Sequence, residues 1–434
     1  MTSTSTADSP ATARRTWNPF KAKVGGVPLP VPVVLTALVV VAGVVHRIPE
    51  DMIGGLAVIT GFGMLLGPLG NRLPIISKIG GGALLCLMIP SVLVYLGVFD
   101  ENILNATAAL MKKANFLYFV ISALVVGSIL GMRRTTMLKA LVKIFPPLVI
   151  GTIVAAGAGI GVAMLFGYSL HRAFFFIVVP IIGGGIGEGV VPLSAGYSHA
   201  LGGEPSSFVA QLIPAAVIGN IVAIVTAGLL RRLGNRRPHL DGGGDLVKHN
   251  TTALEEPPAA VGNYGAGILV ICSTFVTATL CEPALHLPAP VLTIVFSVLA
   301  KLSGVVPTNV EQSARACYNL VAGHFIYPVM VGLGMLYVPL ASVFGVLSAG
   351  FVATCAAVVL AMAGSGFLAG KLLRMYPVDA ALVTVCHSGL GGTGDVAILS
   401  ASDRMVLMPF AQISTRIGGV VTVISAASLI QAFH

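Results

Sequence analysis

Runs of about 20 apolar residues, the length that a helix needs to cross a bilayer, recur along almost the whole chain. This spacing restricts the fold more than any other feature. Hydrophobic residues make up 56% of the 434 residues and charged residues only 9%, whereas soluble chains carry roughly 25% charged residues. The chain is therefore expected to be an all-α polytopic membrane protein.

About eleven transmembrane helices are expected, separated by short loops and two interrupted segments. Residues 1–28 should form a disordered cytoplasmic tail, because they are polar and lack the apolar core of a signal peptide. The polar stretch 231–263 should form a cytoplasmic loop. The crossings are expected near residues 29–46, 52–70, 80–98, 115–131, 142–167, 207–230, 264–281, 289–306, 320–338, 340–363 and 407–431.

Two glycine-dense runs lie inside apolar stretches. The first spans Gly183–Gly187 and the second spans Gly389–Gly394, and a carboxylate residue follows each directly. Glycine costs about 1 kcal/mol relative to alanine inside a helix, so both runs should break their helices. Broken backbone in lipid is tolerated only where protein or a water-filled cavity surrounds it. The sequence therefore predicts two re-entrant hairpins, at 173–200 and 378–400.

The distribution of lysine and arginine supports this arrangement. If the N-terminus is cytoplasmic and each hairpin returns to its own side, 20 of the 25 Lys and Arg residues fall in cytoplasmic regions. Cytoplasmic loops collect these residues in membrane proteins. Counting either hairpin as a full crossing would place the basic cluster of 231–263, or Lys371 and Arg374, outside. The C-terminus is accordingly expected on the outside.

The same topology predicts two inverted five-helix repeats. The first helix and the first repeat would occupy 29–230, and the second repeat would occupy 264–434. Ile218-Gly219 after the first hairpin matches Ile417-Gly418 after the second. The two glycine runs would then be reached from opposite sides and meet near the midplane, as in inverted-repeat transporters.

Arg416 is the most informative single residue. An arginine within a span costs several kcal/mol unless it is paired or hydrated, and is a functional candidate by default. The first repeat has Val217 at the matching position, so the repeat does not require an arginine. A guanidinium binds a carboxylate bidentately, which predicts an anionic substrate. The alternatives are that Arg416 reaches the cytoplasmic interface or pairs with Asp395 or Asp403.

The glycine runs offer two kinds of ligand. Backbone N–H groups at the start of a half-helix favour anions, and unwound carbonyls coordinate Na⁺. Glu188 and Asp395 are candidates for ligating a cation, relaying protons or capping the half-helices. Side chains with oxygen ligands nearby are Ser194, Thr393, Gln412, Ser414 and Thr415. The sequence contains no nucleophile–base arrangement, HExxH motif or metal-ligand cluster, so it is not expected to be an enzyme.

Both runs resemble motifs of the bacterial 2-hydroxycarboxylate transporter family. The stretch Gly183–Ser194 is similar to the first re-entrant motif of that family. Gly391–Asp395, continued through Ser402–Met405 to Ala411–Gly419, is similar to the second motif and the last helix. The resemblance covers residues 30–434.

The resemblance implies symport of citrate, malate or related 2-hydroxy acids across the inner membrane, coupled to Na⁺ and in some members to H⁺. It also implies a homodimer in which a mobile domain carries both hairpins in an elevator-type movement. The substrate-binding residues would be Arg416, Ile186, Gly187, Leu390, Gly392 and Thr393. The Na⁺ sites, built mostly of backbone carbonyls, would be surrounded by Ile181, Gly183, His387, Gly389 and Thr415.

One departure from the family pattern bears on the substrate. Citrate-transporting members place polar or basic side chains near positions 186 and 390, where this chain has Ile186 and Leu390. A single arginine suits a dicarboxylate better than citrate, so malate is favoured without excluding citrate.

Several alternatives remain open at the level of sequence. An H⁺-coupled symporter or an exchanger of the same family would share these motifs. A cation/proton antiporter would use Glu188 and Asp395 as ion carriers, while a channel or an intramembrane enzyme fits the pattern less well. Nucleic acid is not an expected partner, because the net charge of +9 reflects the cytoplasmic loops.

Overall fold

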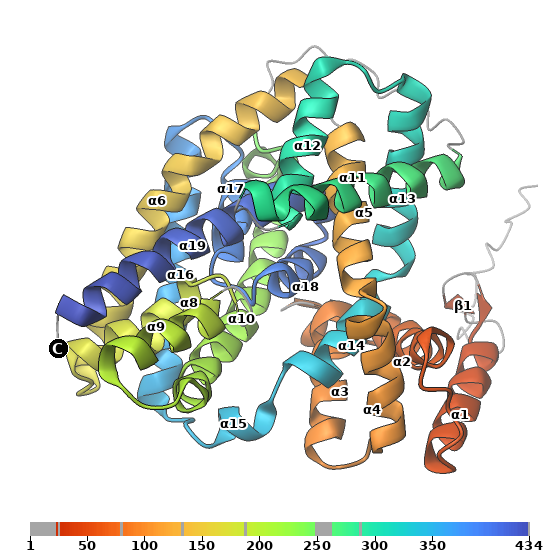
Figure 1. The fold of residues 1–434 in the computed structure, drawn as a ribbon, viewed down its shortest axis with the longest axis horizontal. Coiled ribbons are helices and arrows are strands. Elements are labelled where there is room, and N and C mark those ends of the chain that lie inside the picture. Colours follow the sequence, from red (N-terminus) through yellow and green to blue (C-terminus); the bar gives the residue numbers. More distant parts are fainter. Residues whose placement is uncertain are drawn as a thin grey trace, which may run out of the picture.

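The computed structural model describes residues 23–24, 27–78, 81–131, 134–185, 189–247, 263–285 and 289–432. Nearly all of these residues are helical, as predicted (Figure 1). The strands β1 (Lys23–Val24) and β2 (Val27–Pro28) form a short antiparallel pair near the start of the described chain.

Six helices in the described residues are long and apolar enough to cross a membrane individually. Two further pairs of helices pass the same test together but are bent, by 44° and by 59°, at a short break. The six single helices are α2 (Met52–Arg72), α6 (Arg134–Leu165), α10 (Pro205–Arg236), α11 (Tyr264–Leu285), α16 (Ala349–Leu372) and α19 (Met408–Ala432). These helices confirm a polytopic membrane fold with six to eight candidate spans.

Three of the expected crossings form helices of only 15 residues each, namely α1 (Pro30–Val44), α3 (Gly81–Tyr95) and α12 (Ala289–Ser303). A helix of that length extends about 22 Å, whereas the hydrocarbon core is about 30 Å thick. The expected number of eleven crossings therefore stays a prediction.

The bent pairs differ from the sequence-based expectation. Residues 99–114 read as a loop, but they contain α4 (Glu101–Ala108) and the π-helix Ala109–Lys113, which lead into α5 (Phe116–Gly131). The crossing expected at 320–338 is instead α13 (Thr308–His324) followed by α14 (Ile326–Tyr337). Both α4 and α13 carry polar residues on one face, so their mean hydropathy is low although they are helical.

Both glycine runs interrupt helices, as predicted. In the first interrupted segment, α7 (Leu170–Ala173), the π-helix Phe174–Val178 and α8 (Val179–Ile182) precede the run, and α9 (Val191–Leu201) follows it. In the second, α17 (Pro377–Cys386) ends before the run and α18 (Gly392–Ser402) begins within it. Every described residue of α17 is buried, so this broken backbone lies inside the protein.

The second interrupted segment lies between two groups of helices. Helix α18 packs against α10 and α19 on one side and against α3 and α14 on the other. In Figure 1, α2, α3, α4 and α14 form one group, and α6, α8, α9, α10 and α16 form the other. The segment is therefore in contact with both groups.

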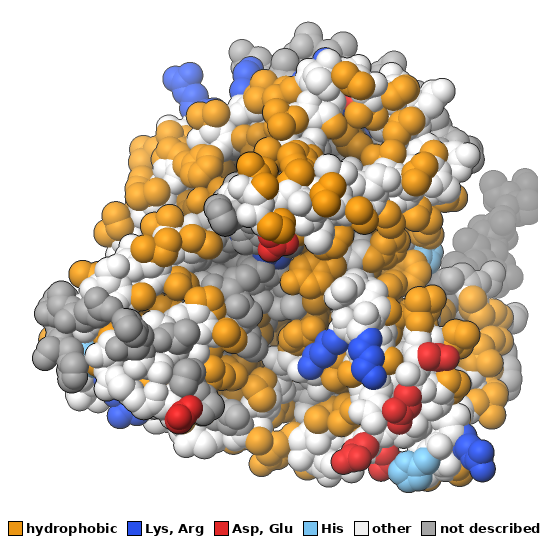
Figure 2. Space-filling model, in the orientation of Figure 1, with side chains coloured by type: hydrophobic (Ala, Val, Ile, Leu, Met, Phe, Trp, Pro, Cys, Tyr) orange, Lys and Arg blue, Asp and Glu red, His pale blue; other side chains and the backbone are white. Residues whose placement is uncertain are grey.

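The outer surface is strongly apolar. Large hydrophobic side chains on α6 and α11 are exposed, including Val142, Ile153, Leu269 and Leu280. Figure 2 shows hydrophobic side chains spread over the visible face, with most charged side chains in its lower part and a few at its top edge. Such a surface suits a lipid environment, because a soluble monomer rarely exposes large contiguous apolar patches.

Candidate functional site

The second glycine run makes a sharp turn between α17 and α18. Gly391 has φ = 68° and ψ = −149° and precedes the first turn of α18, a conformation that is essentially restricted to glycine and costs other residues about 1–3 kcal/mol. The turn is held from α10, because Asn220 Oδ1 accepts a hydrogen bond of 3.2 Å from Leu390 N. Asn220 is buried and was not predicted as a site residue. The sequence signal that could have identified Asn220 was the Ile-Gly-Asn motif, which places an amide side chain within an expected membrane span.

The two glycine runs touch each other. Gly184 and Gly185 have φ values of 89° and 98°. A Cβ atom on Gly185 would collide with the backbone of Leu390 and Gly391, and a Cβ atom on Gly391 would lie 2.7 Å from Gly184 O. The runs meet as the sequence predicted, while their approach from opposite faces of the membrane stays a prediction.

The first run also packs on α19 next to Arg416. A Cβ atom on Gly184 would lie 3.0 Å from Thr415 O, and one on Gly419 would lie 2.9 Å from Gly183 O. This close approach of main chain to main chain is open only to glycine. Arg416 therefore leaves α19 at the level where both runs converge.

A chain of hydrogen bonds connects Asp395 to Arg416. Gln412 Nε2 donates to Asp395 Oδ2 at 2.7 Å, and Arg416 Nε donates to Gln412 Oε1 at 2.8 Å. All three side chains are buried, and Arg416 is only 3% exposed. The arginine therefore does not reach the protein surface. Asp403, one of the partners considered for it, pairs instead with Arg231.

Oxygen atoms gather on the other side of Asp395. Thr415 Oγ1 lies 2.7 Å from Asp395 Oδ1 and 3.1 Å from Cys386 O. His387 is fully buried beside Gly418, and neither ring nitrogen has a hydrogen-bond partner in the described part of the chain. Ser414 Oγ is buried and unpartnered in the same sense. Buried polar atoms without partners are uncommon, and an ion or a water molecule is one kind of group that satisfies them.

Three of the remaining predicted residues lie at the second glycine turn, and Ile181 lies against α10. Gly392 lies at the arginine, because a Cβ atom there would be 3.2 Å from Gln412 Nε2 and 3.3 Å from Arg416 Nη2. Leu390 is buried in the turn itself. Thr393 donates to Leu390 O at 2.6 Å and so caps its own turn. Ile181 packs its side chain against Gly219 of α10.

Three predicted residues, Ile186, Gly187 and Glu188, lie outside the described residues. Of the two carboxylates that follow the runs, only Asp395 can be placed. It lies in the first turn of α18, where a carboxylate suits the helix dipole. Its contacts to Thr415 and Gln412 show that it does more than cap this helix.

The fold and the site together define a membrane protein in which a buried arginine lies beside two glycine turns in the interior. Residues 24–428 match the model of the 2-hydroxycarboxylate transporter family. The chain belongs to this family, whose members are transporters and not enzymes.

Curated relatives are similar over nearly their full length. The Na(+)-malate symporter of Bacillus subtilis is 48% identical over 95% of this chain and 93% of its own. The citrate/malate-proton symporter of the same organism is 38% identical over 95% and 93%. The citrate/sodium symporter of Salmonella typhimurium is 30% identical over 93% and 94%.

Proposed function

We propose that the protein is a secondary active transporter that carries malate or a related 2-hydroxycarboxylate together with Na⁺ across the bacterial inner membrane. The observation that carries this proposal is the placement of Arg416, buried at the point where both glycine turns meet the start of α18. The similarity to an Na(+)-malate symporter supports the choice of ion and substrate.

Arg416 is proposed to bind one substrate carboxylate. Its Nη2 lies beside Gly392, at the helix start whose N–H groups and dipole also favour an anion. Leu390 contributes an apolar wall at the same turn. A site with one cation and one apolar wall suits a dicarboxylate, so malate is the favoured substrate and citrate a weaker one. Ile186, Gly187 and Thr393 are proposed to complete the substrate site.

The coupling ion is proposed to bind on the opposite side of Asp395. Thr415 Oγ1, Cys386 O and Asp395 Oδ1 form a set of oxygen atoms that suits Na⁺. The unpartnered atoms of His387 and Ser414 lie on the same two segments. Backbone carbonyls of Ile181, Gly183 and Gly389 are proposed to supply further ligands. Glu188 remains a candidate for an ionic or structural role.

We further propose that the chain forms two inverted repeats with a hairpin near the end of each, at 173–200 and 378–400. The order of elements supports this, because each half contains a bent pair, then a long helix, then an interrupted segment and a final long helix. Residues 1–28 and 231–263 would be cytoplasmic and the C-terminus outside. A homodimer would hold one group of helices fixed while the group bearing both hairpins moves as an elevator.

The test is uptake of labelled malate into proteoliposomes under an imposed Na⁺ gradient, an imposed H⁺ gradient or neither. The expected result is uptake driven by Na⁺ and blocked more strongly by unlabelled malate than by citrate. Uptake driven by H⁺ alone would reassign the ion, and a strong preference for citrate would overturn the choice of malate. Uptake that requires internal substrate would identify an exchanger.

Replacing Arg416 by Lys separates this proposal from a cation/proton antiporter. Lysine keeps the charge but loses the bidentate geometry, so the affinity for malate should fall roughly tenfold or more. An antiporter with Asp395 as ion carrier would continue to exchange cations in the same variant. Malate concentration dependence and cation-driven pH changes, measured on the same vesicles, distinguish the two.

A further inference from the structure

A cavity of about 540 Å³ lies at the far end of α18 from Arg416. From Gly392, at the arginine, to Ser400, at the cavity, the helix advances about 12 Å, so the two places are distinct. The volume lies within the range of roughly 300–1,000 Å³ that is typical of small-molecule sites. The lining includes Asn71, Arg231, Arg232, Tyr327, Ser400 and Asp403.

One wall of the cavity is neutral and fixed. Asn71 Nδ2 donates to Tyr327 Oη at 2.8 Å, and Asn71 Oδ1 accepts from Gly82 N at 2.8 Å. These contacts tie the end of α2 to α14 and to the start of α3. The amide and the hydroxyl are therefore held in place as hydrogen-bonding groups on this side.

The opposite wall is basic and comes from the end of α10 and from α18. Arg231 pairs with Asp403 at 3.1 Å, with side chains 40% and 72% exposed. Arg232 is half-buried and forms no ion pair within the described residues. Two arginines and one aspartate leave the lining with a net positive charge.

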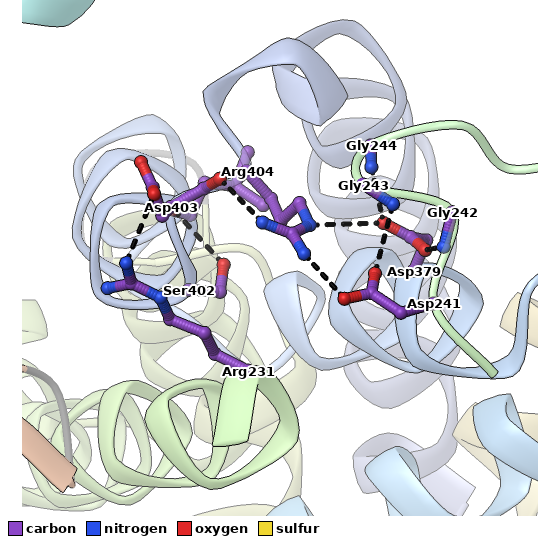
Figure 3. Close-up of polar contacts among 10 residues, drawn as sticks. Arg231, Asp241, Gly242, Gly243, Gly244, Asp379, Ser402, Asp403 and Arg404 are labelled. Carbon is purple, nitrogen blue, oxygen red and sulfur yellow. Dashed lines mark hydrogen bonds and ion pairs between the residues drawn. The ribbon is translucent and has the colours of Figure 1, made fainter. Parts of the chain in front are cut away.

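Nearby acidic groups do not cancel this charge, because they are engaged elsewhere. Figure 3 shows Arg404 directed away from Arg231, toward Asp241 and Asp379. Arg404 Nη2 lies 2.6 Å from Asp241 Oδ2, and Asp379 accepts hydrogen bonds from Gly242 N and Gly244 N at 2.6 and 2.9 Å. Arg404 and these backbone N–H groups engage the two carboxylates, and Arg232 lines the cavity without an ion-pair partner in the described residues.

We propose that this cavity is a second binding site for a small dicarboxylate anion, separate from the Arg416 site. Arg232 and Arg231 bind the carboxylates, and Asn71 and Tyr327 hydrogen-bond the anion from the other wall. The choice of a carboxylate, and of the cytoplasmic side for the basic end of α10, rests on the proposed function. One wall belongs to α2 and α14 and the other to α10 and α18. An anion bound between the two walls therefore stabilises the conformation in which these two groups of helices lie against each other.

The test uses saturation-transfer NMR of malate on the detergent-solubilised full chain carrying Arg416→Ala, which removes the first site. This method detects weak binding at millimolar ligand. Malate signals should persist in this variant, fall at least fivefold when Arg232→Gln is added, and largely return with Arg232→Lys. The matched control is Arg236→Gln, which removes an exposed arginine of the same helix that does not line the cavity.

Loss of all malate signal in folded Arg416→Ala, or equal signals with and without Arg232→Gln, would overturn the proposal. Displacement by inorganic phosphate at a lower concentration than by malate would overturn the carboxylate assignment. If Arg416→Ala does not fold, Arg232→Gln in the otherwise unchanged protein should raise the KM for malate efflux severalfold and leave the KM for uptake unchanged. Malate transport by the unchanged protein tests the proposed function separately. The proposed function and the second anion site can therefore be disproved independently of each other.

Discussion

Gln412 lies between a buried anion and a buried cation, and its amide has to be oriented for both. Asp395 accepts from Nε2, which leaves Oε1 to accept from Arg416 Nε. An amide side chain can present oxygen or nitrogen in nearly the same place, so the carboxylate selects the orientation. Through Gln412, Asp395 thus positions the guanidinium of Arg416.

Replacing Asp395 by Asn should therefore weaken malate binding. An asparagine can donate as well as accept, so it no longer fixes the Gln412 amide, and a charge-assisted hydrogen bond worth roughly 1.5–3 kcal/mol is weakened. The affinity for malate at saturating Na⁺ should fall about tenfold or more. Equilibrium binding of labelled malate measures this.

The control for that variant is Ser402→Ala, since Ser402 is buried on the same helix and its hydroxyl donates, within the described residues, to carbonyls of its own turn. It should leave malate affinity nearly unchanged. If raising the Na⁺ concentration fully restores binding to Asp395→Asn, the carboxylate acts through the ion and not through Gln412.

At the scale of elements, the two broken helices are joined main chain to main chain. Gly391 has a positive φ of 68° in a backbone conformation that favours glycine, and a Cβ atom on it would lie 2.7 Å from Gly184 O. The site therefore depends on two turns with matching shapes. A side chain at either turn would separate the runs and move the start of α18 away from Arg416.

Gly391→Ala should reduce malate uptake at least tenfold while the protein still folds. The backbone conformation costs alanine about 1–3 kcal/mol, and the collision with Gly184 adds to it. Proteoliposome uptake and thermal unfolding measure the two effects. Gly364→Ala on α16 is the matched control, because a Cβ atom there meets nothing within 4 Å. Normal uptake by Gly391→Ala would contradict the close contact of the runs.

At the scale of the whole molecule, the segment after α10 is fastened to the second interrupted segment. Asp379, at the start of α17, accepts from the backbone of 242–244, and Tyr376 N donates to Leu246 O at 3.0 Å. Val247 forms an antiparallel bridge with Met375. Arg404 ties the far end of α18 into the same cluster (Figure 3). This part of the central loop thus belongs to the body that carries α17 and α18.

Arg404→Gln should lower the thermal unfolding temperature by several degrees. It removes the cation from beside the fully buried Asp379 carboxylate, and breaking one side of a buried pair costs roughly 3–5 kcal/mol. Adding Asp379→Asn should recover part of the loss by removing the stranded charge. Arg231→Gln breaks the exposed pair with Asp403, worth about 0–1 kcal/mol, and should change little. An unchanged unfolding temperature in Arg404→Gln would contradict the role of this cluster.

Part of this arrangement could be predicted from the sequence. Glycine runs break helices wherever they occur, and a buried arginine in a span needs a partner, so both runs and Arg416 were found from local composition alone. The bent pairs were not found, because α4 and α13 are amphipathic and their helical nature depends on what packs against them.

The partners within the site were also beyond the sequence. Asn220 and Leu390 are 170 positions apart, and Asp395 and Gln412 meet only because α18 and α19 pack together. The fastening of 242–244 to Asp379 spans more than 130 positions. Such contacts follow from the packing of whole helices, and no pattern of spacing in one chain specifies them.

In the described residues, the two glycine turns approach each other through main-chain atoms, and main chain has no rotamers with which to absorb a displacement. A displacement of one turn therefore displaces the other turn by nearly the same amount. In the proposed transporter, an ion held near Thr415 and an anion held at Arg416 would share this one joint. Binding of the ion or of the anion would then fix the geometry of the other binding site. Transport of both solutes in a fixed ratio requires such a coupling between the two sites.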